Sequence, residues 1–431
     1  MQIHAYGDTD VGRSRSHNED YIVVDPETGL FLVCDGMGGH ASGEVASETA
    51  ARAVQRHMAS QVHLLHHFDG STEACEAIEQ ALRAAIQAAS AEVFDLARGA
   101  QGRHGMGTTC IALMTATTSD GAVKGIMGHV GDSRMYLVRG TAVWQLSQDH
   151  TFFNDAVRNG MMSVEEANAS PWSNMVTRGV GIQSSVAVDT LVFDIVENDT
   201  VLLCSDGLTA YVEDHYELAA VVADPALPGL PKRLIGLANE RGGGDNISAV
   251  LVRGVPEMPA RPADAQRRVQ VTTNLQTLRH IALFMDLDDS ELVRVFRRFE
   301  AVDYEPGTVL IREGDNTDCL YVVVEGDVRI SRVGRQVTTL TRGAHFGEMG
   351  LLNQRPRSAT VTTTSPVHAL ILERGRFNDV LREDSTLAAK LLYKLAQILS
   401  LRLDENISVE ISETSERATR ELGVLSPFRR M

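Results

Sequence analysis

The pattern of hydrophobic and polar positions predicts a first half that mixes short strands with longer helices. Apolar runs bounded by Gly, Asp or Ser are typical of strands, and they occupy 3–12, 21–24, 30–34, 110–117, 124–130, 135–140, 199–204 and 247–252. Stretches with helical spacing predict helices over 43–58, 72–96, 214–223 and 231–241. We interpret 110–140 as three consecutive strands of one antiparallel meander. Residues 149–181 have helical pieces but little strand character, so we expect a flap beside the sheets.

The pattern changes at residue 255. A Pro- and Ala-rich start without periodicity predicts a linker over 255–273, and short amphipathic helices follow at 274–285 and 288–298. Between 304 and 373, short strands punctuated by glycine predict a small all-β roll. The expected limits are therefore 1–254 for a first domain, 255–273 for the linker, 274–406 for a second domain and 407–431 for a tail.

The last predicted helix, 385–403, carries a stripe of leucines four residues apart: Leu387, Leu391, Leu395 and Leu399. Such a stripe most often packs into a core or forms a dimer seam. The helix could form a homodimer through this stripe, or the stripe could cover a bound ligand, and both alternatives stay open.

Composition and charge narrow the classes of partner. The formal net charge is −17, which argues against a nucleic-acid-binding face, because such a face needs basic charge. The five cysteines show no CxxC spacing, which suggests reduced thiols. No apolar run approaches the roughly 20 residues that span a membrane, and the N-terminus has no apolar signal core. We therefore expect a cytoplasmic protein without a membrane partner.

Acidic residues recur where predicted strands meet turns that contain glycine. The acids of this kind are Asp35, Asp132, Asp206 and Asp245, and Glu19 and Asp20 flank the start of a strand. Each of them alone is read most simply as part of a turn or a solvated loop. Packed strands can bring such ends together at one edge of a sandwich. Several carboxylates without His or Cys partners select hard cations such as Mg²⁺ or Mn²⁺.

These acids lie within a series of short motifs. In chain order the motifs are Arg15-x-x-Asn18-Glu19-Asp20, Asp35-Gly36-Met37-Gly38-Gly39, Gly107-Thr108-Thr109, Gly131-Asp132-Ser133-Arg134, Thr177-Arg178-Gly179-Val180-Gly181, Ser205-Asp206-Gly207 and Asp245-Asn246. Over residues 3–254 this order resembles the metal-dependent type 2C Ser/Thr protein phosphatases. The resemblance implies an α+β fold, a four-layer α-β-β-α sandwich of two antiparallel sheets, with a binuclear metal site at one end.

The resemblance also implies metal ligands. Asp35 would bridge two metal ions, and the Gly36 carbonyl would bind one of them. Asp206 and Asp245 would bind the other ion. Asp132 together with Asp206 is similar to the looser third-metal site of bacterial members, so two or three Mn²⁺ or Mg²⁺ ions are expected.

Further roles follow from the same resemblance. Glu19 and Asp20 would lie in or next to the metal shell, through water, and Arg15 would clamp the phosphate with its planar fork. Two metals would acidify a bridging water that attacks phosphorus in line. Many eukaryotic members carry a His after Asp-Gly as the acid for the leaving group. Here the residue is Met37, as in many bacterial relatives, so a water must supply the proton.

The predicted roll contains a candidate anion site, FGEMGLLNQRPRSATV at 346–361. A short helical turn there can present free N–H groups to an anion, and Arg357 adds charge. Over 283–404 the chain resembles cyclic-nucleotide-binding domains, which implies a small jelly-roll-like β-roll with flanking helices. By that resemblance Glu348 holds the ribose 2′-OH, and Arg357 pairs with the cyclic phosphate. Ser358 and the amides near Gly347 assist.

The nucleotide-binding reading leaves two questions open. The hydroxyl at Ser358 is compatible with both cAMP and cGMP, and we favour cAMP. The alternative is a roll that kept its fold and lost its ligand.

Together these patterns predict a serine/threonine phosphoprotein phosphatase that acts on phosphoserine and phosphothreonine proteins and is regulated by a cyclic nucleotide. The competing reading is a non-catalytic scaffold that binds phosphoproteins, in which only the nucleotide sensor is active. The intact set of Asp35, Asp206 and Asp245 disfavours that reading. A third reading makes the second domain a dimerisation element.

Overall fold

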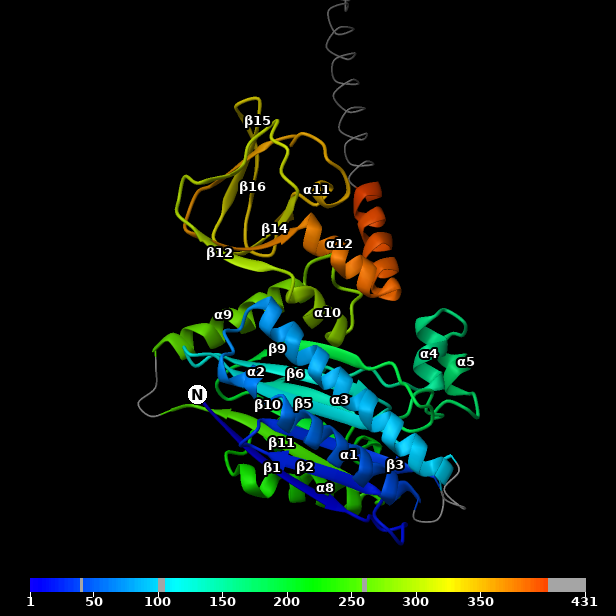
Figure 1. Ribbon diagram of the computed structural model, residues 1–431. Helices are drawn as coiled ribbons and strands as arrows, with labels where there is room; N and C mark the ends of the chain where they lie inside the picture. The colour runs from blue at the N-terminus through cyan, green and yellow to red at the C-terminus, as the bar shows by residue number, and fades with distance from the viewer. Residues whose placement is uncertain (39–41, 100–104, 258–261, 402–431) are drawn as a thin grey trace, which may run out of the picture. The chain divides into compact units, whose positions relative to one another are not determined.

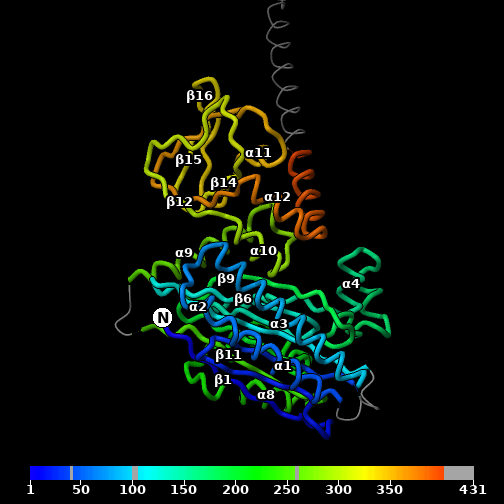
Figure 2. The backbone as a smooth tube through the Cα atoms, in the orientation of Figure 1, coloured from blue at the N-terminus to red at the C-terminus, as the bar shows by residue number. Residues whose placement is uncertain are grey.

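The computed structural model describes residues 1–38, 42–99, 105–257 and 262–401, and Figure 1 shows their helices and strands. The chain forms two compact units. The first contains Met1–Leu275 together with Asp288–Arg297, and the second contains Gln276–Leu287 and the residues from Arg298 onward. The chain therefore passes between the units three times, and Figure 2 traces the same backbone path as a tube.

The first unit contains two antiparallel sheets. One sheet has the order β1-β11-β10-β7-β8, with bounds Gln2–Asp10, Ile247–Val255, Thr200–Cys204, Arg134–Arg139 and Ala142–Gln145. The other has the order β2-β3-β5-β6-β9, with bounds Asp20–Asp25, Leu30–Met37, Cys110–Thr117, Val123–Val130 and Asp189–Ile195. The short strand β4 (Gly107–Thr108) pairs with the end of β3.

Helices cover the outer faces of both sheets. α1 (Ser42–Ser60) and α3 (Thr72–Gly99) pack on the sheet that contains β3, and α7 (His215–Val222) and α8 (Leu230–Glu240) pack on the other sheet. The shorter helices are α2 (His63–His66), α4 (Phe152–Arg158), α5 (Val164–Asn168), α6 (Asp206–Thr209) and the 3-10 turn η1 (Leu227–Gly229). This arrangement confirms the predicted α-β-β-α sandwich.

The expected meander over 110–140 is wrong. β5 pairs with β6, but β7 pairs with β10 and β8 in the opposite sheet. The turn after β6 carries the chain from one sheet to the other, and Gly131 takes φ +109 there, which glycine adopts without a Cβ penalty. The hydrophobic pattern does not reveal the change of sheet, because both strands are buried almost throughout.

The stretch expected to be a linker is largely helical. α9 spans Pro262–Arg279, and Arg267 Nη2 donates to Asp194 Oδ1 of β9 at 2.6 Å. Ala, Gln and Arg favour a helix even without an apolar period, and Pro suits the first helical position. α10 (Asp289–Phe296) confirms the next predicted helix, and it packs with the first unit.

The second unit contains two four-stranded antiparallel sheets. The first is β12-β19-β14-β17, with bounds Glu300–Tyr304, Val367–Glu373, Cys319–Glu325 and His345–Phe346. The second is β13-β18-β15-β16, with bounds Val309–Ile311, Thr360–Thr363, Val328–Arg332 and Arg335–Leu340. The helices are α11 (Met349–Leu352), α12 (Arg374–Glu383) and a last helix over 385–401. The unit confirms the predicted β-roll with flanking helices, and the expected tail lies outside the described residues.

All five cysteines are free thiols, as their spacing suggested. Within the described ranges, no helix is long and apolar enough to cross a membrane.

Candidate functional site

Acidic side chains gather at one end of the sandwich. Asp35 lies near the end of β3, directly opposite Asp20 on β2. Asp206 begins α6 just after β10, and Asp245 lies in the turn before β11, the neighbour of β10. Asp132 lies in the turn that joins β6 to β7. Strands that are distant in sequence thus bring the predicted acids together.

The pKa values of these acids are shifted by burial and by one another's charge. Burial raises the pKa of Asp35 well above its usual value, and the negative charges of Asp20 and Asp206 raise it further. Burial also raises the pKa of Asp20 and that of Asp132, each to about 7. For Asp206, burial and then the charge of Asp245 raise the pKa. Such a cluster needs protons or a cation to offset its mutual repulsion.

The oxygen atoms of this cluster suit a hard divalent cation. Asp20 Oδ2 accepts hydrogen bonds from Ser205 Oγ (2.8 Å) and Ser248 Oγ (2.7 Å). Asp20 Oδ1 and Asp206 Oδ1 are buried and have no hydrogen-bond partner among the described residues. Among the residues that the structure describes, no group of three or more His, Cys, Asp or Glu side chains is arranged so that it could hold a metal ion by itself. Waters and backbone oxygens would have to complete the coordination, as Mg²⁺ commonly requires.

Glycines allow the backbone to close around Asp35. Gly36 N donates to Glu19 O at 3.1 Å, and a Cβ on Gly36 would lie only 2.2 Å from Gly43 O at the start of α1. A Cβ on Gly43 would in turn lie 2.7 Å from Glu19 Cδ, so the Glu19 carboxylate packs against this helix start. The Gly36 carbonyl and Glu19 are therefore held beside Asp35 by close backbone approach.

Arg15 lies at the open side of the cluster. Its Nη2 donates to Asp245 Oδ2 at 2.8 Å, and both side chains are more than a third exposed. The charge of Asp245 raises the pKa of Arg15, and the charges of Glu19 and Asp35 add to this effect. An exposed ion pair of this kind is weak, so the guanidinium can exchange its partner for an incoming anion.

Supporting residues to which we assigned no role from sequence fix the acids in place. Asp35 N donates to Thr109 Oγ1 at 2.9 Å, and that hydroxyl lies 2.7 Å from Ser133 Oγ, next to Asp132. Ser248, which holds Asp20, lies inside the apolar run of β11. A buried serine within an apolar strand was the one local signal of such a contact.

The predicted flap reaches β4 and the end of β3, which carries Asp35. Thr108 and Val180 exchange two backbone hydrogen bonds of 3.0 and 2.8 Å, and Thr108 Oγ1 donates to Asp35 O at 2.8 Å. A Cβ on Gly179 would lie 3.2 Å from Met37 Cε. The segment that follows α5 therefore borders the metal-ligand candidates directly.

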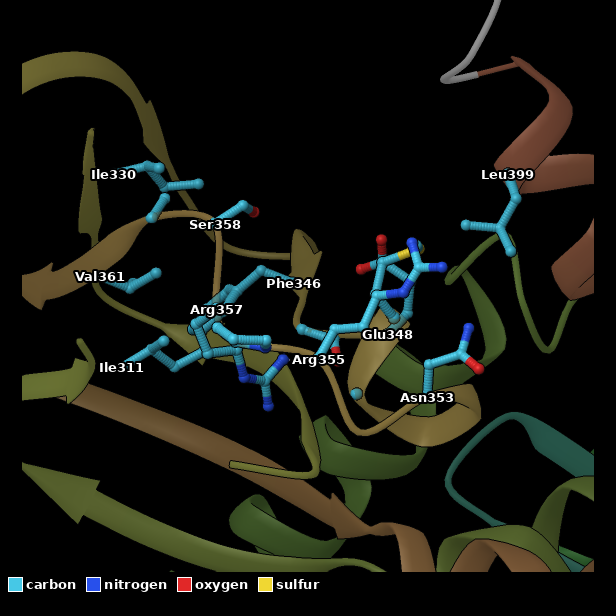
Figure 3. Close-up of a pocket in the computed structure, with 15 residues that line it drawn as sticks. Ile311, Ile330, Phe346, Glu348, Asn353, Arg355, Arg357, Ser358, Val361 and Leu399 are labelled. Carbon is cyan, nitrogen blue, oxygen red and sulfur yellow. Dashed lines mark hydrogen bonds between the residues drawn. The ribbon is translucent and has the colours of Figure 1, made fainter. Parts of the chain in front are cut away.

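The second unit contains a cavity of about 710 Å³ at the predicted anion site. We call the segment 346–361 the cassette. The cavity wall includes the four cassette residues that were predicted to bind the nucleotide, Gly347, Glu348, Arg357 and Ser358. It also includes the apolar side chains of Ile311, Ile330, Phe346 and Val361, the last two from the cassette itself. Figure 3 shows Glu348, Arg355 and Ser358 turned toward a common space, which Leu399 of the last helix faces. Arg355 lines this wall although we assigned it no role from sequence.

Arg357 is held rigidly at the base of this cavity. The residue is 8% exposed, and its guanidinium donates to Thr317 Oγ1 (2.7 Å), Gly347 O (2.9 Å) and Cys319 O (2.8 Å). Burial lowers the pKa of Arg357. Three of its five N–H groups are used in these bonds, which leaves donors for an anion. Gly347 has φ +87, and a Cβ there would lie 2.6 Å from Cys319 O.

The leucine stripe of the last helix has two roles. Leu387, Leu391 and Leu395 are almost fully buried, whereas Leu399 lines the cavity. The stripe is therefore both core and pocket wall, and the homodimer through this helix stays a prediction.

Comparison with known proteins matches the two units to different families. The family described as Protein phosphatase 2C matches residues 11–231, and the Cyclic nucleotide-binding domain matches residues 301–384. The serine/threonine phosphatase stp of Listeria monocytogenes is 36% identical over 253 residues, which are 58% of this chain and 95% of that protein. Protein phosphatase PhpP of Streptococcus pneumoniae is 30% identical over 247 residues, 57% of this chain and 94% of that protein.

Solved structures agree with the assignment of the first unit. The serine/threonine phosphatase of S. agalactiae has a TM-score of 0.51 at 31% identity, covering 58% of this chain and 99% of that one. PstP/Ppp of Mycobacterium tuberculosis has a TM-score of 0.50 at 30% identity, covering 59% and 100%. The fold, the acid cluster and these matches together establish that the chain belongs to the protein phosphatase 2C family and carries a cyclic nucleotide-binding domain behind its phosphatase unit.

Proposed function

We propose that this chain is a Mn²⁺- or Mg²⁺-dependent phosphatase of phosphoserine and phosphothreonine proteins, regulated by a cyclic nucleotide that binds the second unit. The observation that carries the first half is the buried carboxylate cluster around Asp35. Its members raise one another's pKa, and two of its oxygen atoms, Asp20 Oδ1 and Asp206 Oδ1, lack partners among the described residues. Such a cluster costs stability unless a cation occupies it.

The proposed metal ligands follow the resemblance to the family. Asp35 would bridge two ions, with the Gly36 carbonyl on one of them and Asp206 and Asp245 on the other. Asp132 would serve a third, weaker position.

The other two acids, Asp20 and Glu19, would act on the ions through water. Asp20 is held by Ser205 and Ser248, so it orients water rather than moving toward an ion. Glu19, packed against Gly43, does the same from the other side. Bound ions would acidify a water for in-line attack at phosphorus and stabilise the charge that develops there.

The other residues position the substrate. Arg15 can leave Asp245 and grip two phosphate oxygens with its planar fork, which lowers the cost of bringing an anion to an acidic surface. Met37 next to the cluster has no proton to donate, so solvent water protonates the leaving serine or threonine oxygen.

The direct test is Mn²⁺-dependent hydrolysis of a phosphothreonine peptide by the full chain. We expect turnover that a chelator abolishes, and we expect Asp206→Asn to lose it while Asp95→Asn, on the exposed face of α3, keeps it. Undiminished turnover by the Asp206 variant would sink the metal assignment. A wild-type protein that binds the phosphopeptide without hydrolysing it would instead support the scaffold reading.

The second half of the proposal concerns the cavity of the second unit. Arg357 would pair with the cyclic phosphate and Glu348 with the ribose 2′-OH, while Ser358 and the amide of Gly347 add donors. The observation that supports binding is the Arg357 guanidinium in the cavity wall, which three hydrogen bonds hold in place while two of its N–H groups are not used in those bonds.

Calorimetric titration with cAMP and cGMP tests this assignment. We expect cAMP to bind more tightly than cGMP, and we expect Arg357→Gln to weaken both. If neither nucleotide binds the wild type, the roll has kept its fold and lost its ligand.

A further inference from the structure

Helix α10 packs with the first unit, although the residues before and after it in the chain belong to the second unit. Residues Asp288–Arg297 are part of the first unit, whereas Gln276–Leu287 before them and Arg298 after them belong to the second. The helix also lies outside both family matches, which end at 231 and begin at 301. Neither matched segment therefore includes it.

The packing of α10 is that of a built-in element of the sandwich. The helix lies against β8 and β9, and Leu292 and Val295 are 0% and 1% exposed. At its end, Arg297 Nη1 donates to Glu79 Oε2 of α3 at 2.9 Å. Burial of two aliphatic side chains and a partly buried ion pair make this more than a surface contact.

The acidic first turn of α10 holds the chain that leaves β8. Asp289 Oδ2 accepts from Gln145 N at 3.0 Å, and Asp288 Oδ2 accepts from Gln148 Nε2 at 2.6 Å. Gln148 Oε1 also accepts from Arg158 of α4. Arg158 Nη2 lies 4.0 Å from Glu291 Oε1, so the flap helix is tied to the same turn.

The segment held in this way also grips the turn that carries Asp132. Asp149 accepts two hydrogen bonds from the Arg134 guanidinium, 3.0 Å from Nε and 2.7 Å from Nη2. His150 N donates to Gly131 O at 2.8 Å, and Gly131 N donates to His150 Nδ1 at 3.0 Å. A short run of chain, 145–150, therefore joins α10 to both sides of Asp132.

We propose that α10 is a positioning helix of the phosphatase: its acidic first turn clamps segment 145–158, and through it the flap and the Asp132 turn. Because both ends of α10 continue into the second unit, this helix gives that unit a path to the metal centre. The role of Asp132 in this inference rests on the proposed function, whereas the clamp itself does not.

The test compares two variants of the full chain with a matched control. Gln148→Ala removes the bridge between Asp288 and Arg158. Asp288→Asn keeps a good helix cap through its remaining oxygen, since Asn caps as well as Asp. It replaces the oxygen that accepts from Gln148 Nε2 with an NH2 group, which cannot accept that bond. Gln61→Ala is the control, because that exposed side chain bonds only locally, to Ser60.

Hydrogen exchange measures the clamp without any need for catalysis. We expect amides of 145–158 to exchange about fivefold faster in both variants than in the wild type and the control, as the loss of one hydrogen bond implies. Unchanged exchange over 145–158 in both variants would overturn the clamp, whether or not the chain is a phosphatase.

Calorimetric titration with Mn²⁺ alone then measures the link to Asp132. We expect the weakest Mn²⁺-binding step to weaken about fivefold in Gln148→Ala, by the same reasoning, and to stay unchanged in the control. If exchange rises over 145–158 while every Mn²⁺-binding step is unaltered, the transmission to Asp132 is refuted and α10 holds the flap alone.

Discussion

Asp132→Asn should stabilise the metal-free protein at neutral pH although it removes a candidate ligand. Burial, followed by the negative charges of Asp206 and Asp149, raises the pKa of the Asp132 carboxyl from 3.8 to about 7. At 1.36 kcal/mol per pKa unit, ionising this carboxyl in the fold costs at most about 4 kcal/mol. Asn has a similar shape and carries no charge, so the variant avoids that cost.

The sign of the pH dependence follows from the direction of the shift. The folded-state pKa exceeds the unfolded one, so the wild type keeps this stability below 3.8 and loses it as the pH rises to about 7. With a chelator present, we expect the free energies of unfolding of the two proteins to agree near pH 4 and to diverge above it. At pH 7.5 the variant should be more stable by up to about 4 kcal/mol.

Urea denaturation followed by tryptophan fluorescence isolates the relevant unit. Both tryptophans, Trp144 and Trp172, lie in the first unit, so the signal reports on the unit that contains Asp132. Asp95→Asn provides an exposed control in the same unit. Added Mn²⁺ should then stabilise the wild type more than the Asp132 variant. Parallel pH profiles for the two proteins in chelator would refute the placement of Asp132 in a buried acidic cluster.

Three further predictions use the close approaches and ion pairs of the two sites. Gly36→Ala should destabilise the first unit by about 1–3 kcal/mol in urea denaturation, since the added Cβ would lie 2.2 Å from Gly43 O. The control Gly236→Ala, in open space on α8, should be neutral or slightly stabilising. Equal effects of the two substitutions would contradict the argument. Arg15→Ala should lower kcat/KM for a phosphopeptide about 10- to 100-fold with Mn²⁺ binding intact, and an unchanged value would exclude a phosphate contact. Gly347→Ala should weaken nucleotide binding in calorimetry at least tenfold, by about 1.4 kcal/mol, because it displaces the cassette from Cys319 O, whereas Gly375→Ala should not.

The sequence predicted those parts of the site that are marked by a motif of a few consecutive residues. Asp35 and Asp206 each follow a buried strand and precede glycine, a pattern contained within a few residues. Ser205 and Ser248 hold Asp20 from strands far away in the chain, so nothing near Asp20 could reveal them. Periodicity reports the environment of a residue, whereas a hydrogen-bond partner depends on the topology.

Two features of the fold were beyond the sequence for a related reason. The amphipathic pattern predicted a helix near 288–298, but it could not say which unit the helix joins. That choice depends on partners such as Gln145, whose backbone N–H donates to Asp289, 144 residues further along the chain. The crossing of β7 into the second sheet likewise depends on which edge remains unpaired, because a strand buried on both faces fits either sheet.

The placement of α10 sets limits on how this protein can be divided or recombined. A chain that stops before Asp288 keeps the matched phosphatase segment but removes the aliphatic partners of β8 and β9, and so leaves an apolar face in water. A chain that begins after Arg297 separates the nucleotide-binding roll from Gln276–Leu287, which packs with it. No single break yields both units whole. When the nucleotide-binding unit is exchanged between proteins of this kind, α10 has to move with it. The receiving phosphatase unit then needs strands that match this helix, as β8 and β9 do here.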